Sequence, residues 1–150
     1  MTATDELIDI ARDIAAQAHA GEQVEAYVVR SQQTDVEVFG GEVESLTTAG
    51  VEGVSVRVIV DHRQGLAWAG SFDPEVIAET LRDARDNARF GEPDEFFALA
   101  GPSDVNGHRP AALDLWRDDL AAVSTEAKVK VALDLERATL AADEIGRAHV

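Results

Sequence analysis

The stretch that decides the fold runs from Gly40 to Gly70 and reads GGEVESLTTAGVEGVSVRVIVDHRQGLAWAG. Apolar and polar residues alternate over 54–60, so one face of this segment carries Val54, Val56, Val58 and Val60. A period of two is typical of a strand with one buried face. The turn-forming residues at Gly40-Gly41 and at 61–65 let the chain reverse on either side. The stretch therefore predicts an antiparallel meander.

Further strand-like segments surround this meander. The segment 24–39, VEAYVVRSQQTDVEVF, is rich in valine and aromatic residues, and the polar pair Gln32-Gln33 leaves open whether it forms one strand or two. Strands are also predicted at 42–48, 54–60 and 66–69. The short turns between them leave no room for parallel crossovers. The sequence predicts an α+β fold with an antiparallel sheet of four to five strands and three helices packed on it.

The first two helices have recognisable ends. Thr4 or Asp5 is expected to cap the first helix, which Gly21 ends. Asp73 is expected to cap the second helix, with Pro74 at its first position. The spacing of Ile77, Leu81, Ala84 and Ala88 predicts the buried stripe of this helix, which closes at Phe90-Gly91. A loop follows over about 92–119, for which Phe96, Phe97 and Trp116 are the expected apolar anchors.

The third helix, capped by Ser124 or Thr125, is apolar on two opposite sides. One side gathers Val131, Leu135, Ala138 and Ala142, and the other gathers Val129, Leu133 and Leu140. A helix needs only one apolar face to dock on a sheet. We expect the Leu135 side to face inward, which makes Val129, Leu133 and Leu140 the candidate contacts with a partner. The pattern suggests the front part of a longer protein.

Composition narrows the class of protein further. The 150 residues match one domain, residues 1–150, and carry a formal charge of −16. Such a charge repels nucleic acid and anionic membrane surfaces, so neither is an expected partner. There is no cysteine, which excludes disulfides and thiolate chemistry. The amino terminus has acids where a targeting peptide would have basic residues, so we expect a cytoplasmic protein.

No catalytic, metal-binding or cofactor-binding residue is predicted in this chain. The four histidines, His19, His62, His108 and His149, lie far apart in the sequence, and no HExxH spacing occurs. No G-x-S-x-G nucleophile turn and no G-x-G-x-x-G phosphate loop is present. Acidic pairs such as Asp118-Asp119 are typical of a solvated surface.

The order of these elements resembles the amino-terminal domain of the TldD/PmbA family, which is related to zinc metallopeptidases and was formerly called modulator of DNA gyrase. The resemblance rests on ELIDIARDIA, on VEAYVVRSQQTDVEVFGGEVES, on GVSVRVIVDHRQGLAWAGSFDPEVIAETLRDARDNARF and on ALDLW with the last helix. This chain has Asp61-His62 where the family commonly has a glycine-containing turn, a departure that concerns the shape of the loop.

The resemblance implies a cytosolic complex of two such subunits that degrades unfolded peptides. One subunit would carry zinc on a histidine-glutamate helix in a later, catalytic domain, which is absent from this chain. Whether the chain is part of an enzyme is therefore open. Its own role would be architectural: contact with a second TldD/PmbA-type subunit, in a homodimer or heterodimer, and formation of the cleft that admits the peptide. The alternatives are a zinc-free partner subunit and a free-standing protein-interaction adaptor.

Overall fold

The computed structural model describes residues 3–101, 103–104, 106–107, 111 and 118–142. The elements are α1 (Ala3–Ala15), β1 (Gln23–Phe39), β2 (Glu42–Val60), β3 (Arg63–Ala69), α2 (Pro74–Phe90), α3 (Asp118–Ala121) and α4 (Thr125–Ala142). None of the helices in these ranges is long and apolar enough to cross a bilayer.

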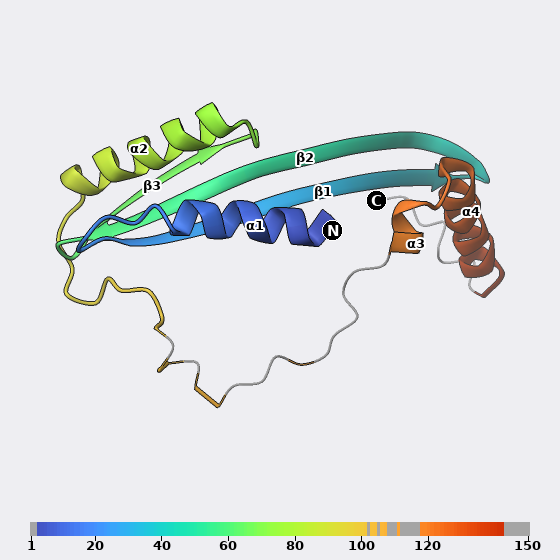
Figure 1. Ribbon diagram of the computed structural model, residues 1–150. Helices are drawn as coiled ribbons and strands as arrows, with labels where there is room; N and C mark the ends of the chain where they lie inside the picture. The colour runs from blue at the N-terminus through green and yellow to red at the C-terminus, as the bar shows by residue number, and fades with distance from the viewer. Residues whose placement is uncertain (1–2, 102, 105, 108–110, 112–117, 143–150) are drawn as a thin grey trace. The chain divides into compact units, whose positions relative to one another are not determined.

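The three strands form an antiparallel sheet in the order β1-β2-β3 (Figure 1). Gly40 and Gly41, both with positive φ, connect β1 to β2. Asp61 and His62 connect β2 to β3 and also have positive φ, at 50° and 59°. Two-residue hairpin turns of this kind need positive φ, which Asp and His adopt more readily than most other residues. The pairing of β2 with β3 runs from Val60 opposite Arg63 to Val54 opposite Ala69.

The sequence predicted a sheet of four to five strands, but the described residues form only three. This part of the prediction is wrong. The segments 42–48 and 54–60 belong to one strand, β2, because residues 49–53 continue the extended backbone. Likewise, Gln32-Gln33 does not interrupt β1. Glycine and polar residues lower strand propensity, but pairing with a neighbouring strand supplies backbone hydrogen bonds that hold them extended.

The chain divides into two compact units. Unit 1 contains residues 1–31 and 51–110, and unit 2 contains residues 32–50 and 111–150. The strands β1 and β2 contribute residues to both units.

Unit 1 holds the main hydrophobic core. Val54, Val56 and Val58 of β2 are buried, as the alternation predicted. They pack in one cluster with Val24 of β1, Ile14 of α1, and Leu81 and Ala84 of α2. Because the three valines lie on one face of the sheet, α1 and α2 cover the same face.

The approach of α2 to β3 is very close. A Cβ atom built on Gly65 would lie 2.1 Å from the carbonyl oxygen of Ala84 and 2.2 Å from the amide nitrogen of Ala88. From Gly65 onward, the residues of β3 that face α2 are accordingly small: Gly65, Ala67 and Ala69. The larger residues of β3, Leu66 and Trp68, point to the other side of the sheet.

The helix ends agree only partly with expectation. Asp73 caps α2 by accepting hydrogen bonds from the backbone N–H groups of Glu75 (2.8 Å) and Val76 (3.4 Å), and Gly91 follows its last residue, both as predicted. Ser124 accepts a hydrogen bond from the N–H of Ala127, which confirms it as the cap of α4. The helix α1 begins at Ala3, so neither Thr4 nor Asp5 is its cap.

Candidate functional site

The site candidates are surfaces, because the described residues contain no cluster of three or more His, Asp or Glu side chains able to hold a metal ion. His19 lies in the turn after α1 and His62 in the turn between β2 and β3. The other two histidines, His108 and His149, lie outside the described residues.

The first surface is the side of the unit 1 sheet opposite α1 and α2, here called the open face. Ala26 and Val28 of β1 pack against the core, so Tyr27 between them points to the open face. Leu66 and Trp68 of β3 point to the same side. These three side chains are 66%, 53% and 77% exposed. Exposed aromatic side chains that share one face of a sheet with an exposed leucine are typical of interaction sites.

An ion pair lies on the open face between these apolar groups. The Arg57 guanidinium donates to the Glu25 carboxylate from Nε at 2.8 Å, and its Nη2 lies 2.7 Å from the same oxygen. Arg57 is opposite Leu66 in the β2–β3 register, and Ser55 is opposite Trp68. The guanidinium is thus fixed beside an apolar side chain, which gives the surface both apolar area and oriented polar groups.

Sequence reasoning missed the open face, although a signal was present. In β3 the larger residues alternate with glycine and alanine. The usual rule places the larger apolar residues inward. A glycine among the small residues of the alternating set marks a close approach of another backbone, and here the larger residues therefore lie on the opposite side.

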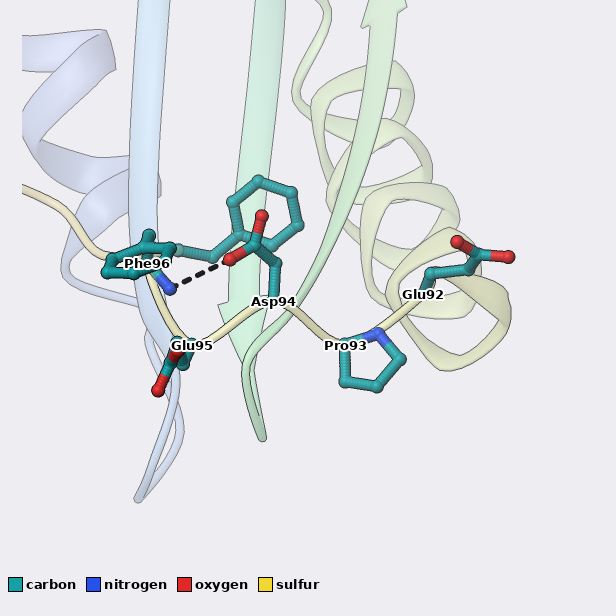
Figure 2. A pocket seen from close by; sticks show the side chains of 6 residues that line it. Glu92, Pro93, Asp94, Glu95 and Phe96 are labelled. Carbon is teal, nitrogen blue, oxygen red and sulfur yellow. Dashed lines mark hydrogen bonds between the residues drawn. The ribbon is translucent and has the colours of Figure 1, made fainter.

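A second candidate is a depression of about 490 Å³ lined by Glu92, Pro93, Asp94, Glu95, Phe96 and Phe97 (Figure 2). The Asp94 carboxylate is already engaged within the segment, since it accepts a hydrogen bond from the N–H of Phe96 at 2.9 Å. The segment is anchored by the N–H of Asp94 to the carbonyl of His62 (2.7 Å) and by the N–H of Leu99 to the side chain of Gln23 (2.8 Å).

The three residues expected to anchor the 92–119 loop differ in their burial and in whether the structure describes them. Phe97 is half-buried, whereas Phe96 is 83% exposed, so only the former serves as an anchor of the chain on itself. Trp116 lies outside the described residues. The one-turn helix α3, at 118–121, was not expected.

The third candidate is α4, whose orientation is the reverse of the expected one. Val131 and Leu135 are 68% and 66% exposed, and Ala138 is also exposed. Val129, Leu133 and Leu140 are half-buried. The prediction that Leu135 faces inward is therefore wrong. The sequence could not decide the orientation of this helix, because both of its sides are apolar. The role of Val129, Leu133 and Leu140 as partner contacts stays a prediction.

Two side chains of α4, Glu136 and Lys128, make hydrogen bonds to described residues of unit 2. The carboxylate of Glu136 accepts hydrogen bonds from the N–H groups of Gly40 (2.8 Å) and Gly41 (2.9 Å). The ammonium group of Lys128 donates to the hydroxyl of Thr34 at 3.2 Å. The exposed side of the helix carries Asp134, whose pKa is lowered by hydrogen bonds from Lys130 and Arg137 and by their charges.

In unit 1 a further ion pair joins the turn after α1 to α2. Arg85 donates from Nε to both carboxylate oxygens of Glu22 at 3.1 Å, and from Nη2 to the carbonyl of Gln17 at 2.6 Å. Burial tends to raise the pKa of Glu22, but the hydrogen bonds from Arg85 and from the His19 N–H, with the Arg85 charge, lower that pKa below its usual range. The pair fixes the scaffold that supports the open face.

Residues 24–88 match the sequence profile of a family described as PmbA/TldA metallopeptidase domain 1. Metalloprotease PmbA of Escherichia coli O157:H7 is 29% identical over 140 residues, which are 92% of this chain and 30% of that protein. An uncharacterised protein of Methanocaldococcus jannaschii is 26% identical over 91 residues, 59% of this chain and 22% of that protein. The chain thus spans less than a third of the length of these relatives.

Solved structures share the fold. TldE from Thermococcus kodakarensis superimposes with a TM-score of 0.66 and 24% identity, covering 95% of this chain and 30% of that one. A protein from Bacteroides thetaiotaomicron described as a putative modulator of DNA gyrase superimposes with a TM-score of 0.74 and 23% identity, covering 95% and 33%.

Proposed function

Because this chain belongs to the TldD/PmbA family as its amino-terminal domain, we propose that it serves as an architectural domain of a TldD/PmbA-type metallopeptidase system that degrades unfolded peptides. Its task in this proposal is to contact a second family subunit and to form one wall of the cleft that admits the peptide. Zinc and the hydrolytic residues would belong to a later domain of the catalytic subunit.

The open face is the observation that supports this proposal most directly. It presents Tyr27, Leu66 and Trp68 on a sheet whose other side is fixed by a buried core. Large aromatic side chains on a rigid support lose little conformational entropy on binding, so they are effective contacts between proteins. The Arg57–Glu25 pair would supply polar contacts between these apolar side chains.

The test measures binding of the chain to the TldD-type subunit of the same genome. We expect the two to form a complex by sedimentation, and Trp68→Ser and Leu66→Ser to weaken it at least about tenfold each. Phe90→Ser is the matched control, because Phe90 is 88% exposed but lies at the end of α2, away from the open face. Failure to bind, or equal weakening by all three changes, would overturn the proposal and favour a free-standing adaptor.

Zinc analysis of the complex separates the two roles within the family. A complex in which the parent protein of this domain carries zinc identifies the catalytic subunit. Zinc confined to the other subunit identifies the parent as the zinc-free partner, in which case this domain serves binding alone.

A further inference from the structure

The turn between β1 and β2 forms a small site for an anion. Gly40 and Gly41 have φ values of 64° and 85°, and their N–H groups both point to the same carboxylate. Successive backbone N–H groups in a turn make a concave binding place for negative oxygens. Here the place is filled by Glu136 of α4, one carboxylate oxygen to each N–H group.

Among the described residues, the other contacts of α4 bury little of the helix. No residue of α4 is buried. Its half-buried apolar residues are Val129, Ala132, Leu133 and Leu140, and in the described part of the chain Lys128 adds a hydrogen bond to Thr34. Since half-buried side chains gain only part of the free energy of full burial, the charge-assisted hydrogen bonds of Glu136 become a large share of what holds the helix.

We propose that Glu136 is a latch: its carboxylate holds α4 on the β1–β2 turn, and loss of this contact releases the helix. Release exposes Val129, Leu133 and Leu140 to a partner. This last step rests on the proposed function, because the partner would be the second family subunit. The latch itself rests on the geometry of unit 2 alone.

The chain has no cysteine, so a single introduced thiol reports the exposure of one position. Leu133→Cys places the thiol on the docked side and Leu135→Cys on the exposed side. We expect the Leu133→Cys thiol to react more slowly with a maleimide than the Leu135→Cys thiol. Adding Glu136→Gln should accelerate the Leu133→Cys reaction about tenfold and leave the Leu135→Cys reaction unchanged, since the amide offers one acceptor oxygen and no charge.

Asp134→Asn is the matched control. Asp134 lies on the same helix and carries the same charge, but its partners are Lys130 and Arg137 rather than the turn. It should therefore leave the labelling of Leu133→Cys unchanged. The melting of the unit 1 core, followed by circular dichroism, should be the same in all these variants.

Equal labelling of Leu133→Cys with and without Glu136→Gln would overturn the latch, as would equal acceleration by Asp134→Asn. These measurements use the chain alone. A negative result would leave the proposed subunit contact through the open face intact, and failure of that contact would leave the latch intact.

Discussion

Gly65 shows how one residue sets the arrangement of a whole surface. The absence of a side chain lets the backbone of α2 come within van der Waals contact of β3, where a Cβ atom would overlap Ala84 and Ala88. With α2 so near, the neighbouring inward positions accommodate only Ala67 and Ala69. The larger side chains of β3 are consequently on the open face, where binding is proposed.

We predict that Gly65→Ala lowers the free energy of unfolding by about 2 kcal/mol or more, since overpacking against backbone atoms cannot be relieved by a rotamer change. Gly70→Ala is the matched control. A Cβ atom there would meet nothing nearer than the Glu52 carbonyl oxygen at 3.7 Å, so stability should stay nearly unchanged. Urea denaturation of both variants checks this, and similar midpoints for the two would contradict the close approach.

Glu22 gives a prediction about pH. Its pKa is lower in the folded chain than in the unfolded one, so the pair with Arg85 stabilises the fold above the unfolded pKa. That contribution is lost as the pH falls through the folded pKa. Glu22→Gln should therefore cost roughly 2 kcal/mol at pH 7 and progressively less in acid.

The exposed pair of Asp9 and Arg12 supplies the control for that measurement. These side chains are 59% and 76% exposed and 3.6 Å apart, a geometry in which ion pairs contribute little. Asp9→Asn should change the urea midpoint only slightly at either pH. A cost of Glu22→Gln that is the same at pH 7 and pH 3 would contradict the assigned role of its charge.

At the scale of elements, a helix or strand could be predicted from the sequence where the contacts that determine it lie within the element itself. The sequence predicted α2 from Asp73 to Gly91 because its caps and its buried stripe are set by neighbours within the helix. It did not predict that β2 runs without a break, because the residues 49–53 are held extended by pairing with other strands. The apolar pattern of α4 also did not predict which side of the helix faces inward, since both of its sides are apolar.

A pair of substitutions tests the orientation of α4. Leu135→Glu places a charge on a side chain that is already 66% exposed, and we expect little change in helix content or stability. Leu133→Glu places the same charge on the docked side, and we expect α4 to detach, with a loss of helical signal in circular dichroism. The opposite result, with Leu135→Glu the more damaging, would restore the orientation expected from the sequence.

At the scale of the whole chain, burial is distributed unevenly. All nine buried apolar residues found among the described positions belong to unit 1: Ile14, Val24, Val54, Val56, Val58, Ile59, Leu81, Ala84 and Ala88. In the described part of unit 2, α4 is held by half-buried residues and by the contacts of Glu136 and Lys128. The period-2 alternation predicted where the core of unit 1 lies, but no single segment of the sequence shows that the same two strands continue into a thinly packed unit.

We therefore predict that hydrogen exchange separates the two units. The amides of Val56 and Val58 should exchange only through global unfolding, because their strand lies between two others and under two helices. The amides of α4 should exchange about a hundredfold faster or more, after correction for intrinsic rates, since opening a thinly packed unit costs only part of the global free energy. Protection of α4 equal to that of Val56 would mean that one cooperative core spans both units, and it would also leave too large a barrier for a latch held by a single carboxylate.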